Sequence, residues 1–371
     1  MNNKVSSTQI GMLLALMCCS LYLGIGDIIL LRKSENEVLI AMIVGVVIGL
    51  IPVLMYLKVN SSLPSLNIYE KNIKFFGKVI GKIVNILIII IYIVMLTIAI
   101  RAIVIFVTSK YLQNTPFYFV GILAITTSLI ISFKGLETIA RVSQLSFFAS
   151  IAFMAIIEFF LVQYIEIGNL LPIISGNNFL SNMFSGAIYY ASTCSLLTML
   201  LLTINKSEIK DQKKYNRNII IFYLVGSLSL VIVMFFVVSC FGYKMGSLFR
   251  YPEYILLKKI GISSAELHLE NLLAFRWIFY MLTLANLSLY GIINGIKQFS
   301  KKMMSTKIIT VIISIICMIL GKIAFGNIPH SIIVVKNYYV PFIAIPMFTL
   351  LVIMFIRSLF IKVETKKWLF L

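Results

Sequence analysis

Long apolar runs alternate with short polar segments along most of the chain. Each run has about the 20 residues that a helix needs to cross the hydrocarbon core of a bilayer. The pattern predicts an all-α integral membrane protein with about ten transmembrane helices, and residues 1–371 form one polytopic membrane domain. The predicted spans cover 9–31, 37–57, 83–107, 116–133, 142–163, 181–204, 218–241, 271–296, 308–325 and 338–361.

Composition supports this interpretation. Of the 371 residues, 60% are hydrophobic and only 12% are charged, and the mean hydropathy is +1.02. A soluble domain carries about 25% charged residues. This chain has too little polar surface to cover so much apolar surface. A soluble enzyme, a nucleic-acid-binding domain and a secreted disulfide scaffold are therefore excluded.

The distribution of positive charge predicts the orientation. There are 32 Lys and Arg against 13 Asp and Glu. An even number of spans places both termini on one side. The segments on that side hold 21 of the 32 cations and the opposite segments hold 9, while Arg101 and Arg276 lie within spans. The positive-inside rule then predicts that both termini are cytoplasmic.

The residues that usually perform catalysis or bind metals are scarce. The five cysteines all lie in apolar runs without metal-ligand spacing, and the only histidines, His268 and His330, fall in predicted loops. The cytoplasmic segments contain no paired carboxylates or nucleophile at catalytic spacing. We therefore expect neither a cofactor nor a metal site, and we expect that the protein is not an enzyme.

The segment 250–270 is less apolar than the spans. Tyr254, Leu257 and Ile260 recur at helical spacing with lysines between them. Pro252 suits the first turn of a helix, where its missing N–H would have no partner. The pattern favours an amphipathic helix that lies on the outer face over an eleventh span.

The first span contains a candidate binding site. Gly24-Ile25-Gly26-Asp27 interrupts the run with two glycines, each of which weakens a helix by about 1 kcal/mol relative to alanine. Transporters use such discontinuous helices to present free backbone groups to a solute at mid-membrane, and Asp27 could cap the second half-helix. Alternatively, the glycines permit close helix packing and Asp27 meets water outside the membrane.

The sixth span carries a second candidate. Ala191, Ser192, Thr193 and Ser195 form a small, hydroxyl-rich patch near mid-membrane. Such residues bind solutes, but they also serve packing between transmembrane helices. Because neither glycine nor proline interrupts the patch, a break in this helix is indicated less directly than in the first.

Ionisable residues inside the spans cluster by depth. Counted at about 1.5 Å per residue, Asp27, Arg101, Glu158 and Arg276 all fall in the outer third of the bundle. Intramembrane charges usually face a water-filled cavity or pair with one another. One hypothesis is an outer vestibule for a zwitterion, with acids near its ammonium group and an arginine near its carboxylate. The alternative is that each side chain reaches separately to the outer surface.

The positions of the two candidate breaks suggest two halves. Spans one to five (9–163) and six to ten (181–361) would each contain five helices, and an odd number per half requires that the halves be inverted. We detect no sequence repeat between them, so this inference rests on the arrangement of spans.

Several motifs resemble one family. QNTPFYF (113–119) and KGLETIARVSQ (134–144), supported by Ser6 and Gln9 near the N-terminus and by the two glycines of the first span, are similar to the B subunits of nutrient germinant receptors of endospore-forming bacteria. That family belongs to the amino acid/polyamine/organocation transporter superfamily. The resemblance covers nearly the whole chain. Within the second motif, Glu137 and Arg141 are spaced to pair on one helical face.

The resemblance implies a fold and a function. The fold would be the five-plus-five inverted repeat of LeuT-like transporters, with a discontinuous first helix and a sixth helix that could also be discontinuous. The protein would sense a small germinant, an amino acid being the expected class, in the spore inner membrane. An A subunit and a lipoprotein C subunit would be its partners. The alternative is a working amino-acid permease coupled to protons or sodium.

Overall fold

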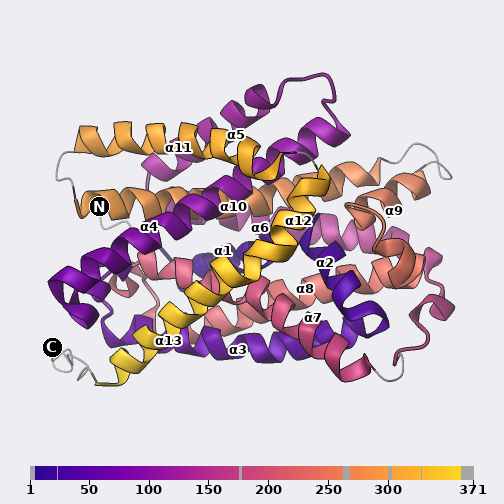
Figure 1. Ribbon diagram of the computed structural model, residues 1–371, viewed down its shortest axis with the longest axis horizontal. Coiled ribbons are helices and arrows are strands. Elements are labelled where there is room, and N and C mark those ends of the chain that lie inside the picture. The colour runs from indigo at the N-terminus through magenta and orange to yellow at the C-terminus, as the bar shows by residue number, and fades with distance from the viewer. Residues whose placement is uncertain are drawn as a thin grey trace.

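A computed structural model describes residues 5–22, 24–174, 178–261, 268–299, 303–326 and 328–360. Within these ranges the chain forms helices and turns, and its only β-type pairing is an isolated bridge between Val5 and Ile209. Most helices run along the longest axis of the molecule (Figure 1). Helix α1 begins and α13 ends at the same end of this bundle, which we call the N-terminal end (left in Figure 1).

The helices follow one another with short connections. In chain order they are α1 (Ser7–Ser20), α2 (Gly26–Ser34), η1 (Glu35–Glu37), α3 (Val38–Ser62), α4 (Ile68–Lys110), α5 (Phe117–Phe133), α6 (Leu136–Leu161), η2 (Val162–Tyr164), η3 (Ile167–Leu170), α7 (Phe179–Cys194), η5 (Leu196–Thr203), η6 (Lys206–Glu208), α8 (Gln212–Gly246), α9 (Pro252–Gly261), α10 (Leu269–Lys297), α11 (Met303–Phe325), α12 (Ile328–Tyr339), the π-helix η7 (Val340–Ala344) and α13 (Ile345–Phe360).

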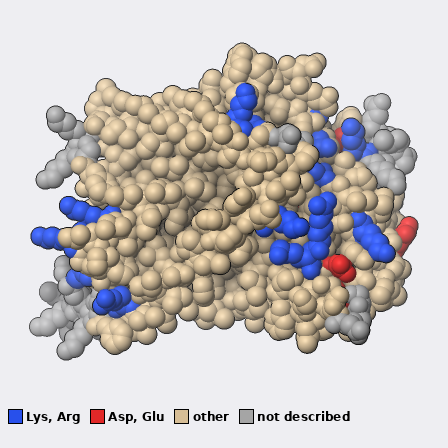
Figure 2. Space-filling model, in the orientation of Figure 1, with Lys and Arg blue, Asp and Glu red and all other residues tan. Residues whose placement is uncertain are grey.

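Each predicted apolar run coincides with a helix or with consecutive helices. Eight helical stretches of the described residues are long and apolar enough to cross a membrane, and α1 and α5 are shorter apolar helices of 14 and 17 residues. Figure 2 shows Lys and Arg toward the left edge and in the right half, separated by a broad uncharged band. The protein is therefore a multi-pass membrane protein.

The discontinuity predicted in the first span is confirmed. Helix α1 ends at Ser20 and α2 begins at Gly26. Between them Gly24 has a φ of +95°, a conformation that a residue with a Cβ rarely adopts. The Asp27 N–H donates to the Tyr22 carbonyl (2.9 Å), which joins α2 to the end of the break.

The sixth span also changes its winding. Helix α7 ends at Cys194, and the chain continues as the tighter 3₁₀ helix η5. Mid-helix 3₁₀ segments often mark a hinge or a strained sequence. No glycine or proline marks this change, so the sequence indicated it only weakly.

Two spans are longer than the hydropathy pattern predicted. Helix α4 begins at Ile68, because the lysine-rich amphipathic stretch before the apolar run is also helical. The helix is kinked at Gly77 (φ +80°). Toward the C-terminus, helical structure begins at α12 and passes through the single π-helical turn η7, which contains Pro341. Such turns accommodate a residue that cannot continue a regular helix.

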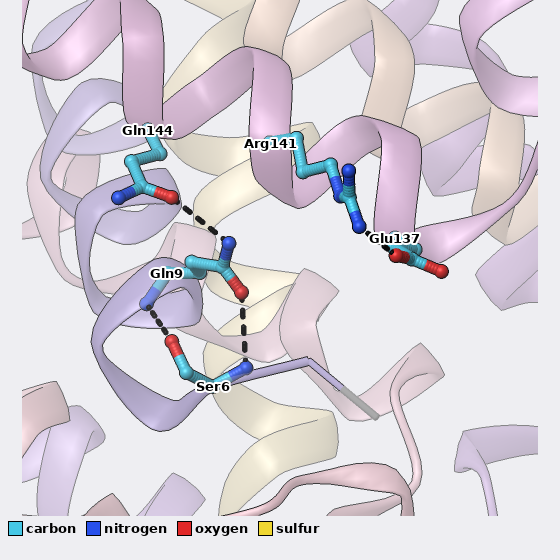
Figure 3. Close-up of polar contacts among 5 residues, drawn as sticks. All are labelled: Ser6, Gln9, Glu137, Arg141 and Gln144. Carbon is cyan, nitrogen blue, oxygen red and sulfur yellow. Dashed lines mark hydrogen bonds and ion pairs between the residues drawn. The ribbon is translucent and has the colours of Figure 1, made fainter. Parts of the chain in front are cut away.

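Helix α1 is attached at its start by polar contacts (Figure 3). Ser6 and Gln9 form a reciprocal capping box. The Gln9 amide also donates to Gln144 of α6 (Nε2–Oε1 2.9 Å). The predicted ion pair between Glu137 and Arg141 is confirmed one turn away on α6. Beyond these contacts α1 is almost fully buried among α6, α8 and α10.

Candidate functional site

The break between α1 and α2 borders a cavity of about 50 Å³. This volume exceeds what one water molecule needs, but it is far below the roughly 300–1,000 Å³ of pockets for drug-sized ligands. The cavity therefore suits a small solute. Six parts of the chain line it: the break (Leu21, Gly24, Ile25), α4 (Ile98, Ala102), α7 (Tyr189, Thr193), the turn before α9 (Arg250, Tyr251), α10 (Trp277, Met281) and α12 (Val335, Tyr339).

Most of the lining is apolar or aromatic, but two polar groups have unused hydrogen-bonding capacity. The Tyr189 side chain is 3% exposed, and its hydroxyl has no hydrogen-bond partner. A Cβ added to Gly26 would lie 3.7 Å from that hydroxyl, so the hydroxyl lies beside the start of α2. Nε and Nη1 of Arg250 are also buried without partners. Buried polar atoms are normally paired, so these groups indicate a missing partner.

Two positive groups border the cavity, and the carboxyl groups of Asp27 and Glu253 lie close to them. The guanidinium of Arg250 is one positive group, and the N-terminal end of α2, where the helix dipole is positive, is the other. Both favour the carboxylate of a small organic ligand. Trp277, Met281 and Ile98 would contact its apolar part.

Tyr251 covers the break. A Cβ added to Gly24 would lie only 2.3 Å from Cε1 of Tyr251. The Tyr251 ring packs against Phe106 (centroids 5.0 Å apart) and Trp277 (5.9 Å). Burial raises the pKa of Tyr251 to about 12, so its phenol is neutral. Gly24 is thus required both for its backbone conformation and for the close approach of this ring.

Asp27 lies beside the cavity without lining it. It is fully buried in the first turn of α2, and its Oδ1 accepts a hydrogen bond from the Ile28 N–H (2.8 Å). Its carboxyl group is within hydrogen-bonding range of Glu253 from α9, and Arg250 contributes a favourable charge. Burial, and then the Asp27 carboxylate, raise the pKa of Glu253 well above its usual range.

Glu158 lines a separate, smaller cavity of about 20 Å³. Arg276 and Glu253 line the same cavity. Arg276 is 3% exposed and donates from Nε to the Tyr280 hydroxyl (3.3 Å). The charges predicted to share one depth of the bundle therefore do come together in part, around Glu253.

The hydroxyl-rich patch of the sixth span is divided between two cavities. Thr193 lines the cavity at the break. Ala191, Ser192 and Ser195 line an apolar cavity of about 200 Å³ between α3, α7 and α13. The Ser192, Thr193 and Ser195 hydroxyls donate to carbonyls one turn back in their own helix. Only Thr193 is thus placed to meet a solute at the break.

Arg101 does not line the cavity, although its neighbour Ala102 does. Its guanidinium donates to the Gly326 carbonyl, between α11 and α12 (2.5 Å). Arg250 takes the position beside the break that the vestibule hypothesis gave to an arginine of the spans.

Sequence reasoning missed Arg250, Glu253 and Tyr189. The first two lie in the segment that was expected to form an outer amphipathic helix. Helix α9 does begin at Pro252, and Leu257 is buried. Residues 262–267 lie outside the described ranges, and so do the side chains of Lys259 and Ile260. The sequence signal for Arg250 and Glu253 was the string RYPEY (250–254), in which they stand beside two tyrosines and a proline.

Comparisons with known proteins agree with this architecture. The chain is similar to the protein YfkT of Bacillus subtilis (strain 168), whose name assigns it provisionally to spore germination, with 25% identity over 275 residues, or 74% of each chain. Among solved structures it resembles Mhp1, a nucleobase-cation-symport-1 family transporter in a closed conformation with bromovinylhydantoin bound.

The likeness to Mhp1 has a TM-score of 0.61 at 10% sequence identity, and it covers 96% of this chain and 91% of the other. At this identity it shows the fold alone, which is the LeuT-like transporter fold expected from the sequence. The fold and the family together indicate a membrane transporter or receptor that is not an enzyme. Residues 4–326 match the family described as spore germination protein, and the chain belongs to that family.

Proposed function

We propose that this protein is a germinant-sensing subunit of a receptor in bacterial endospores, and that it binds a small solute, with an amino acid as the best-suited class, in the cavity at the α1–α2 break. Membership of the spore germination protein family supports the biological role. The cavity supports the ligand class, because it combines a cationic end with an apolar wall.

One observation carries the proposal. The Tyr189 hydroxyl and two nitrogens of Arg250 are buried at the cavity without partners. Leaving such groups unpaired costs about 1–3 kcal/mol each, and more where the group is charged. A ligand with a carboxylate and a short apolar side chain would remove this penalty, and water in an empty cavity would do so less completely.

Sensing requires that the ligand favour one conformation over another. Tyr251 lines the cavity on one side, and Gly24 and Ile25 of the break directly before α2 line it on another. A ligand that contacts both would stabilise the closed arrangement of α2 relative to the turn before α9. That difference is what a partner subunit would detect.

The family resemblance suggests the cellular setting. We propose an A subunit and a lipoprotein C subunit as partners, the spore inner membrane as the location, and cytoplasmic termini. The excess of Lys and Arg in the segments at the N-terminal end supports this orientation.

The binding proposal is tested with purified full-length protein in detergent and a panel of radiolabelled L-amino acids. We expect saturable binding of at least one of them. Arg250→Gln removes a charged hydrogen bond and should weaken binding by about ten-fold or more. Tyr189→Phe removes a neutral hydrogen bond and should weaken binding by about five-fold. Lys244→Gln, at an exposed lysine at the same end of the bundle, is the matched control and should change nothing.

Equal affinity in wild type and in both cavity variants would overturn this assignment of the site. Failure of every amino acid in the panel to bind would reject the ligand class. Circular dichroism and gel filtration of each variant establish that the fold is intact before binding is compared.

A coupled amino-acid permease is the second candidate, because the fold is shared with a cation symporter. Uptake by the purified chain in proteoliposomes separates the two functions. A receptor subunit should bind its ligand without accumulating it. Accumulation that depends on an imposed proton or sodium gradient would favour the permease.

A further inference from the structure

Two acidic side chains from different elements meet beside the cavity. Asp27 belongs to the first turn of α2 and is fully buried, while Glu253 belongs to the first turn of α9 and is 6% exposed. Their carboxyl groups lie within hydrogen-bonding range of each other. Even so, Oδ2 of Asp27 and Oε1 of Glu253 are both buried without a donor.

A single proton shared between the two carboxyl groups would supply the donor that both lack. Two adjacent carboxylates in a buried site cannot both ionise readily, because like charges at short range repel strongly where water is excluded. If one carboxyl group is protonated, it donates to the other, and both buried oxygens can be satisfied. The pair then titrates as a unit rather than as two separate groups.

Further charged groups of both signs lie near the pair. Glu158 brings the number of buried or half-buried carboxyl groups to three, whereas Arg250 and Arg276 supply two guanidinium groups. Arg101, which is half-buried, also lies close enough to Arg250 to repel it, so the positive charge near the pair comes from three arginines. The groups that face the pair are Arg250 and Tyr251 before α9, Arg276 on α10, Tyr22 in the break and Tyr189 on α7.

The pair is directly connected to the cover of the cavity. Glu253 follows Arg250 and Tyr251, both of which line the cavity. Tyr251 has a φ of +63°, which is unfavourable for a bulky residue and persists only where the surroundings hold it. The contact between Glu253 and Asp27 holds the chain two residues beyond this strained position.

We propose that Asp27 and Glu253 form a proton-binding site that acts as a latch: with one proton shared between them α9 is joined to α2 and Tyr251 covers the cavity, and without that proton the two carboxylates repel and the cover is released. The proton exchanges with bulk water. The regulatory meaning rests on the proposed function, because it assumes that the covered cavity is the ligand site.

The test uses the full chain with Trp277 as a reporter, because Trp277 packs against Tyr251. The sequence has two tryptophans, so Trp368→Phe leaves Trp277 alone. Quenching of its fluorescence by acrylamide is measured from about pH 5 to about pH 9, where a raised carboxyl pKa would titrate. We expect quenching to increase at least about two-fold toward high pH as the cover opens.

Two substitutions of Glu253 should have opposite effects. In Glu253→Gln the amide donates to Asp27 at every pH, so quenching should be low and independent of pH. In Glu253→Ala the latch is absent, so quenching should be high and independent of pH. Glu166→Gln, at an exposed acid, is the matched control and should keep the wild-type profile.

A flat wild-type profile would overturn the proposal, and so would identical behaviour of the Gln and Ala variants. The result is separable from the proposed function. If the cover responds to pH but the protein binds no amino acid, the proposed function is rejected and the latch is supported. If the protein binds an amino acid but the cover does not respond to pH, the latch is rejected and the proposed function is supported.

Discussion

Gly24 shows how strongly a single residue determines this site. Its φ of +95° and the Tyr251 ring that would approach an added Cβ to 2.3 Å both exclude a side chain. Gly24→Ala should lower stability by about 1–3 kcal/mol through backbone strain alone, and it should weaken amino-acid binding because Tyr251 must move. Thermal unfolding in detergent and the binding assay measure the two effects.

Gly168→Ala is the control for that substitution, because Gly168 lies at the same end of the bundle with no atom near an added Cβ. Its stability and binding should match wild type. Combining Gly24→Ala with Tyr251→Ala separates the two causes. The double variant should lose the clash but keep the strain, so a full recovery of stability would show that φ at this position contributes nothing.

Glu253 gives the molecule a pH dependence of known sign. Its pKa is raised by burial and by Asp27, so the folded protein binds a proton that the unfolded chain releases above the usual pKa of about 4.3. Stability should therefore be highest at low pH and should fall as the pH rises toward the raised pKa. Unfolding temperatures of wild type should follow this trend, whereas those of Glu253→Gln should lack this component.

At the scale of elements, α1 is held to its neighbours by a few neutral contacts. Gln9 donates to Gln144 of α6, and Asn218 of α8 donates to the Ser7 hydroxyl (2.8 Å). Movement of α1 relative to α6 and α8 must break these bonds. Gln9→Ala and Gln144→Ala should each destabilise the closed state by about 1 kcal/mol, seen as weaker amino-acid binding.

A double-mutant cycle tests whether the two glutamines act through each other. If they do, the double variant should bind about as well as either single variant. Additive losses would mean that the contact between α1 and α6 does not contribute to closure. Asn218→Ala provides the comparison, because it releases the same helix from a different neighbour and should add to either loss.

Some elements of the fold and of the candidate site could be predicted from the sequence, and others could not. The spans and the break at Gly24 followed from apolar run length and paired glycines, which act locally. The change of winding after Cys194 has only a weak local signal, because no glycine or proline accompanies the hydroxyl-rich patch, and the 3₁₀ helix η5 that follows is fully buried. Arg250 and Glu253 were missed because charges between apolar runs are explained equally well by solvation. Their burial depends on how α9 folds back onto α10, which periodicity cannot specify.

At the scale of the whole molecule, the bundle is consistent with one orientation in the membrane. Two exposed positions at opposite ends of α6 test it: Lys134, just before the helix, and Gly168, after it. In a cysteine-free background, Gly168→Cys should react with a membrane-impermeant maleimide from outside intact cells, and Lys134→Cys should react only after permeabilisation. This result is expected because basic segments are retained on the cytoplasmic side. The opposite labelling pattern would place the termini outside and turn the Arg250–Tyr251 cover toward the cytoplasm, where it could not admit a solute from outside.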